Sequence, residues 1–294
     1  MKYYYDPNSP DKESTSDPNM DPGPASTVPP GTIRETTKTQ FAKMKGQPFK
    51  VKLKYFLGYY KYQLLGFAAV AAVLISIIVS IATHKDYAFF SMLINSINID
   101  AEAIQDSFGE YAGIDLDTYE CYVDANAVSS PNMNSSAELG TDTRFAASIS
   151  TKDLDCIIAN SDMFLQKACN EVFVDLTQVL SDEDIEKFKD RFFYIDASIF
   201  DNENYEVTVL ESYGTREEQW DRLKIQMDPS GMKKPVAIGI VCEDCELNLK
   251  TDCYYSSIPV FGIILNSQRF DTAVSFLHYI YDENVDFTTI TSIY

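Results

Sequence analysis

Three of the six cysteines fall in one short segment, where their spacing could support chemistry. Cys242-x-x-Cys245 is followed by Cys253, and the other three are spread over residues 121–169. The segment could form a local disulfide, keep free thiols, or take part in metal or redox chemistry. Zinc would need a fourth ligand, which neither a second C-x-x-C nor a nearby histidine supplies. We expect a candidate disulfide among Cys242, Cys245 and Cys253, and no metal or cofactor.

Polar side chains also follow three apolar runs of strand length. These candidate ligand-binding residues are Asn95, Asp124, Asn160, Ser161 and Asp162. In α/β sheets, ligands bind outside the carboxyl ends of the strands, where such side chains would lie. Asn, Ser and Asp at these places also commonly cap the following helix. Both interpretations stay open at this point.

Signatures of catalysis and of nucleic-acid binding are missing from the sequence. It contains no G-x-S-x-G, no P-loop, no G-x-G-x-x-G and no H-E-x-x-H, and it has only two histidines. The 294 residues include 24 Lys and Arg against 44 Asp and Glu, a net charge of −20. Phosphate backbones need cationic partners. We therefore predict neither an enzyme nor a nucleic-acid-binding protein.

Beyond residue 87, strand-like and helix-like patterns alternate. Strands are predicted at 88–95, 118–128, 153–160, 235–241 and 259–266, and a polar loop at 129–140. Helices are predicted at 99–111, 142–150, 161–169 and 267–283, and after the capping boxes at Ser181 and Thr215. Strands interleaved with amphipathic helices predict an α/β sandwich with a parallel or mixed sheet.

Two blocks of this outer region resemble extracellular solute-binding proteins, which are periplasmic-binding-protein-like. Residues 144–182 carry the family's helix, buried strand and turn, followed by its F-x-D-L-T segment at 173–177. Residues 259–283 are similar to its closing strand and helix, with Gly262, Asn266, Ser267 and Ala273 in place. The resemblance implies a solute-binding fold whose strand-to-helix turns, such as 160–162, face a cleft.

A nineteen-residue run without charge, residues 64–82, precedes this region. At about 1.5 Å per residue it would span about 28 Å, close to the hydrocarbon core of a bilayer. Residues 41–63 hold six lysines and no acid, whereas residues 83–294 hold fourteen basic and thirty-eight acidic residues. The positive-inside rule places the N-terminus in the cytoplasm.

These patterns predict four parts: a disordered cytoplasmic tail at 1–40, a basic aromatic juxtamembrane segment at 41–63, a transmembrane helix at 64–82 and an extracytoplasmic domain at 83–294. The tail is rich in Pro, Ser, Thr and Asp. We expect a single-pass cell-membrane protein that binds a small solute or an envelope protein, with transporter subunits as candidate partners. The alternative is a non-catalytic envelope interaction or structural protein with a degenerate solute-binding fold. The outer region is shorter than the two-lobed members of the family.

Overall fold

The computed structural model describes residues 45–46, 48–83, 85–131, 135–201 and 214–291. The chain divides into two compact units, Met1–Ala82 and Thr83–Tyr294. The predicted tail at 1–40 lies outside the described residues. We call the second unit the outer domain.

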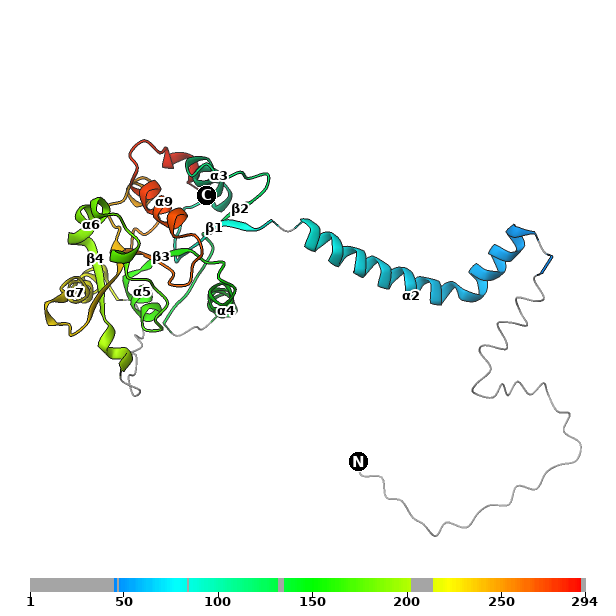
Figure 1. Ribbon diagram of the computed structural model, residues 1–294, viewed down its shortest axis with the longest axis horizontal. Helices are drawn as coiled ribbons and strands as arrows, with labels where there is room; N and C mark the ends of the chain where they lie inside the picture. Colours follow the sequence, from blue (N-terminus) through cyan, green and yellow to red (C-terminus); the bar gives the residue numbers. More distant parts are fainter. Residues whose placement is uncertain (1–44, 47, 84, 132–134, 202–213, 292–294) are drawn as a thin grey trace, which may run out of the picture. The chain divides into compact units, whose positions relative to one another are not determined.

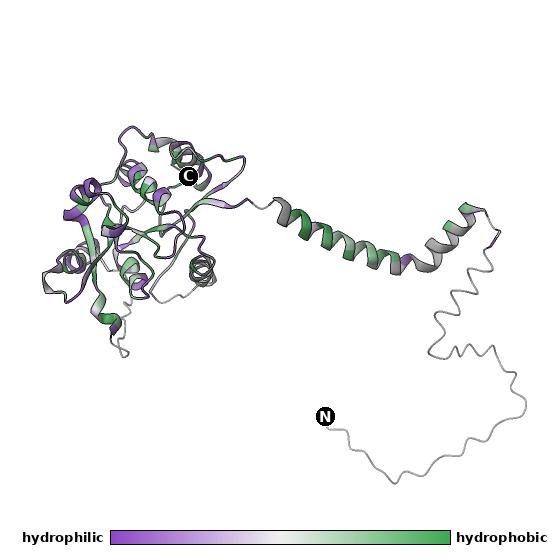
Figure 2. Ribbon diagram, viewed as in Figure 1, coloured by the Kyte–Doolittle hydropathy of each residue, from purple (hydrophilic) through white to green (hydrophobic). Residues whose placement is uncertain are grey.

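The first unit contains one long helix, α2 (Phe49–Thr83), which includes the apolar run at 64–82. Figure 2 colours much of this run green, for hydrophobic residues. Several of its apolar side chains lie open to the surroundings, including Leu65, Phe67 and Ile78, which are 68%, 76% and 64% exposed. Among the residues whose side chains the structure describes, which within this run are 64–79, no helix is both long and apolar enough to cross a membrane.

The outer domain is built on a six-stranded mixed sheet with the order β2-β1-β3-β6-β5-β4. Figure 1 labels β1, β2, β3 and β4 among the helices of this domain. The strands are β1 (Tyr87–Ile94), β2 (Glu120–Asp124), β3 (Cys156–Asn160), β4 (Phe192–Asp196), β5 (Pro235–Val241) and β6 (Pro259–Ile263). β2, β1 and β3 run parallel, whereas β6, β5 and β4 pair antiparallel with their neighbours. The expected α/β class with a mixed sheet is confirmed.

Helices cover both faces of the sheet because its strands are apolar on both sides. Phe89 and Leu93 of β1 pack into one hydrophobic cluster, and Phe90 and Met92 pack into the other. The first cluster draws on α3 (Ala101–Tyr111), α6 (Asp182–Phe188), α8 (Glu246–Thr251) and α9 (Phe270–Tyr281). The second draws on α4 (Ser136–Thr151), α5 (Ser161–Ala168) and α7 (Arg216–Met227). The outer domain is therefore a three-layer sandwich.

Three local predictions were wrong. The polar stretch predicted as a loop to residue 140 contains the start of α4, because Ser135 and Glu138 form a capping box that begins this helix. The second and last predicted strands end early, at Asp124 and Ile263. Strand β4 and the short helix α8 were not predicted at all.

Candidate functional site

The carboxyl ends of β1, β2 and β3 meet at one edge of the sheet because these strands are parallel. Their registers place Met92 opposite Asp124 and Ile94 opposite Ala159. The chain passes from β1 to β2 on one side and then to β3 on the other, so the strand order reverses between β1 and β3. Such a reversal is the usual ligand position in an open α/β sheet. We call this region the β1–β3 edge.

Asn95 and Asp124 lie at this edge, and both are engaged in local structure. The Asn95 amide donates to the Ser129 carbonyl and accepts from the Ser129 N–H, both at 2.8 Å. Asp124 Oδ1 accepts from the Asn126 N–H at 3.1 Å. Its buried Oδ2 makes no hydrogen bond to any residue that the structure describes, but it lies 3.0 Å from Arg144 Nη2, an ion pair. No described bond joins either residue to the turn at 160–162.

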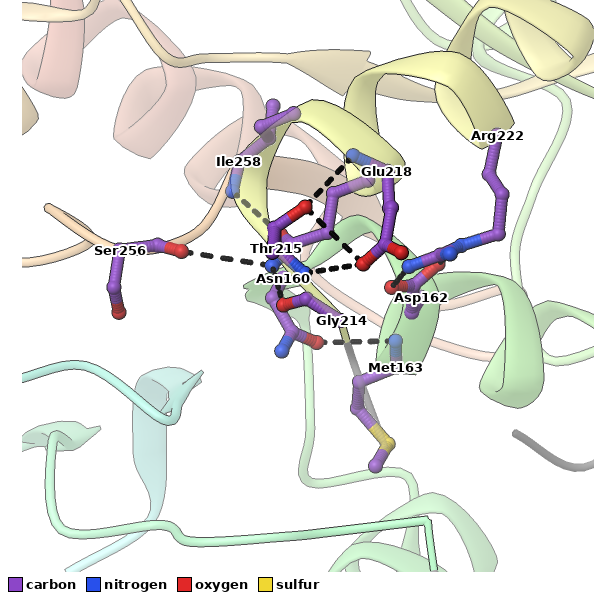
Figure 3. A network of polar contacts seen from close by, with 10 residues as sticks. Asn160, Asp162, Met163, Gly214, Thr215, Glu218, Arg222, Ser256 and Ile258 are labelled. Atoms are coloured by element: carbon purple, nitrogen blue, oxygen red, sulfur yellow. Dashed lines mark hydrogen bonds and ion pairs between the residues drawn. The ribbon is translucent and has the colours of Figure 1, made fainter. Parts of the chain in front are cut away.

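Asn160, the last residue of β3, begins α5. Its backbone is extended and its Oδ1 accepts from the Met163 N–H at 3.0 Å, as an N-cap requires. Asp162 is held from α7 by a two-pronged contact: Arg222 Nε donates to Oδ1 at 2.8 Å and Nη2 to Oδ2 at 2.7 Å (Figure 3). Both oxygens of the buried carboxylate are thus paired with a partly exposed guanidinium. A bidentate pair between an arginine and a carboxylate fixes the orientation of both side chains as well as neutralising their charges.

Gln219 ties the start of α7 to the loop before β6. Its Oε1 accepts from the Ile258 N–H at 3.3 Å, and its Nε2 donates to the Gly214 and Ser256 carbonyls at 3.4 and 3.5 Å. Figure 3 shows Gly214 and Ile258, two of its partners, in the same network of polar contacts as Asn160 and Asp162. Sequence reasoning missed both Gln219 and Arg222. A signal was available, because they stand four and seven residues after the Thr215 cap, a spacing that places them on one helix face.

Ser161, the middle residue of the predicted turn, differs from its two neighbours because its side chain makes no described hydrogen bond. Its N–H donates to the Ile258 carbonyl at 2.9 Å, but its buried Oγ has no hydrogen-bond partner among the described residues. An orphaned buried hydroxyl is unfavourable and is rare in folded proteins. It lies at the first residue of α5, beside the reversal in strand order.

The cysteines of the 242–253 segment are buried thiols. Burial raises the pKa of Cys242 well above its ordinary value, and burial raises the pKa of Cys253 to about 12. The Cys245 sulfur accepts from the Asn248 N–H, and Cys253 donates to Asn248 Oδ1 at 3.7 Å. Among the described residues, no group of His, Cys, Asp or Glu is arranged to hold a metal ion. The candidate disulfide stays a prediction.

His278 lies in a hollow of about 600 Å³ between α6 and α9. Its Nε2 is 2.8 Å from Asp184 Oδ1, and Ser181 Oγ donates to Asp184 Oδ2 at 2.7 Å. Burial raises the pKa of Asp184, but the bonds from Ser181 and His278 outweigh it and hold the pKa below its usual value. The serine and the histidine both bind the carboxylate and not each other, so they do not form a nucleophile–base pair.

Comparison of the chain with protein-family models, with curated protein sequences and with solved structures gives no match.

Proposed function

We propose that the outer domain binds a small solute or an envelope protein at the β1–β3 edge, around residues 160–162. The observation that carries this proposal is the buried Ser161 hydroxyl, which lies beside the reversal in strand order and has no hydrogen-bond partner in the described part of the chain. A ligand that supplies a hydrogen-bonding group to Ser161 Oγ would satisfy it. The groups around it, Asn160, Asp162 and Arg222, are already oriented by their own bonds, which favours a preformed site.

The resemblance to extracellular solute-binding proteins supports the same site. The two resembling blocks, 144–182 and 259–283, contribute the adjacent strands β3 and β6, with Ile158 opposite Phe261. The first block also contains α5 and the turn at 160–162. We propose a periplasmic-binding-protein-like fold on this basis, with transporter subunits as candidate partners.

We further propose that the apolar part of α2 anchors the protein as a single pass in the cell membrane. The exposed leucines, isoleucines and valines between Leu64 and Val79 need an apolar surrounding, and lipid would supply it. The lysines of 41–63 support an orientation with the N-terminus in the cytoplasm and the outer domain outside the cell. Protease added to intact cells would then digest the outer domain and spare an epitope at the N-terminus. Protection of both ends would contradict this orientation.

A second candidate function is a non-catalytic envelope interaction protein with a degenerate solute-binding fold. The observation that favours it is that Asn95, Asp124, Asn160 and Asp162 all have internal partners. Because these side chains already cap helices and join loops, their hydrogen bonds are explained without a ligand. The two functions differ at Ser161, whose buried hydroxyl a bound ligand would satisfy.

A thermal-shift screen of residues 83–294 against sugars, amino acids, peptides and divalent metals tests the proposal. A ligand that binds only the native state stabilises it by about 2.7 kcal/mol at one hundred times its dissociation constant. We expect one ligand class to raise the melting temperature of the wild type, and Ser161→Ala to abolish that shift. Ser150→Ala is the matched control, because the exposed Ser150 hydroxyl bonds only within its own helix. If the domain unfolds cooperatively and no compound in the library changes its melting temperature, the result would favour the interaction protein.

A further inference from the structure

An apolar pocket of about 160 Å³ lies at the opposite edge of the sheet. Its position follows from the antiparallel registers: Asn160 pairs with Pro259, and Cys156 pairs with Ile263 at the other end. The pocket is lined by Leu265 beyond β6, by Val236 at the start of β5 and by Ala168 at the end of α5. It is therefore separate from the turn at 160–162.

Eight of the nine lining residues are apolar, and aromatic rings form part of the wall. The Phe173 ring stacks on Phe164, with ring centres 4.3 Å apart. Leu265 is 53% exposed, so the pocket opens to the surroundings. Its volume is close to that of a cavity of about 150 Å³ that is known to admit one benzene molecule. The pocket therefore has room for a single ring or a branched aliphatic group.

Glu171 is the one ionisable residue of the lining, and it is exposed. It holds a left-handed backbone, with φ of 53°. Glycine adopts this conformation readily, whereas a residue with a Cβ is strained there. A carboxylate on the rim of an apolar pocket can pair with the cationic group of a molecule that enters the pocket.

We propose that this pocket binds a small arylalkylammonium ion, with the ring inside the pocket and the ammonium paired with Glu171. The volume of the pocket limits the apolar part of the ligand to a single ring, and the carboxylate at the rim favours a ligand with a positive charge. Edge and face contacts with Phe173 and Phe200 would orient the ring. The site is independent of the function proposed for the β1–β3 edge.

The experiment uses the full-length chain in lipid nanodiscs and 2-(4-fluorophenyl)ethylammonium as the probe, followed by fluorine NMR line broadening. Empty nanodiscs correct for partition into lipid. We expect saturable binding of the cation, and at least tenfold weaker binding of 4-fluorophenylacetate, which carries the same ring with the opposite charge.

Three variants of the pocket and one control variant separate this pocket from general attraction to an acidic protein. Ala197→Phe fills the pocket and should abolish saturable binding. If that variant has a lowered melting temperature, Leu265→Trp, which blocks the pocket at its rim, replaces it and should also abolish saturable binding. Glu171→Gln should weaken binding about two- to fivefold, the range of an exposed ion pair. Glu110→Gln removes one charge from the exposed end of α3 and should leave binding unchanged. No saturable binding by the wild type, or equal binding by the pocket-filled variants, would overturn the proposal.

Discussion

Phe164 positions α5 on the sheet, and Gly262 of β6 makes room for its ring. A Cβ at Gly262 would lie 2.5 and 2.6 Å from two carbons of this ring, and 3.1 Å from the Ile238 carbonyl oxygen. The ring is fully buried, and it packs against Phe173 and Phe193 with centre distances of 4.3 and 5.2 Å. These rings therefore restrict how far it can move. We predict that Gly262→Ala destabilises the outer domain.

Inserting one carbon into a packed core costs about 1–3 kcal/mol. For a domain of this size that lowers the melting temperature by about 2–12 °C. The measurement is urea unfolding of residues 83–294, followed by circular dichroism. Gly140→Ala is the matched control, since a Cβ there meets nothing within 4 Å and the residue lies inside α4. That change should stabilise the helix by up to about 1 kcal/mol.

A double-mutant cycle identifies the cause. Combined with Phe164→Leu, which shortens the side chain that the new methyl group meets, Gly262→Ala should cost at least about 1 kcal/mol less than it does alone. The cost of Phe164→Leu itself cancels in the cycle. A Gly262→Ala variant within about 0.5 kcal/mol of the wild type, or additive behaviour of the two changes, would refute the reasoning.

Three further predictions concern buried polar groups of the outer domain. Asp155→Asn should destabilise it by about 1–3 kcal/mol in urea unfolding, because an amide nitrogen replaces one of the oxygens that accept from the Phe90 N–H, Ser267 and Arg269; an effect below about 0.5 kcal/mol would contradict this role. Ser161→Ala should stabilise the ligand-free domain by about 1–3 kcal/mol, because it removes a buried hydroxyl without a partner; a loss of stability would show that the hydroxyl is satisfied. The lowered pKa of Asp184 means that its ionised form stabilises the fold above the unfolded pKa of about 3.9, and that this contribution disappears as the pH falls through the folded pKa. The stability difference between wild type and Asp184→Asn should therefore shrink as the pH falls below about 4, and a difference that stays unchanged from about pH 5 down through the folded pKa would exclude this linkage.

The sequence predicted the order of most helices and strands because each carries a local signal. Capping boxes marked the starts of α6 and α7, and the spacing of apolar residues marked α9. The polar composition of residues 129–140 obscured the capping box at Ser135. Strand β4 was missed because its five residues follow a charged helical turn, and its place at the edge of the sheet depends on pairing with β5.

The candidate site was predicted only in part, for a physical reason. Strand ends can be read from local patterns, so Asn95, Asp124 and Asn160 were found at the expected edge. Arg222 is sixty residues from Asp162 in sequence, and only the packing of α7 beside α5 brings the two together. Whether a polar residue is satisfied or left unpaired depends on such distant contacts. Ser161 and Asp162 therefore look alike in the sequence, although they differ in the structure.

The two proposed binding regions share α5. Its first residue, Ser161, lies at the β1–β3 edge, and its last, Ala168, lines the apolar pocket. Phe164 fixes the helix between them by packing over the glycines of β5 and β6. A change that moves the whole helix, such as Gly262→Ala, should therefore disturb both regions. Ser161→Ala and Ala197→Phe should each disturb only the region in which they lie, because neither alters the contact between Phe164 and the sheet. This contrast separates loss of a binding group from loss of the helix that positions it.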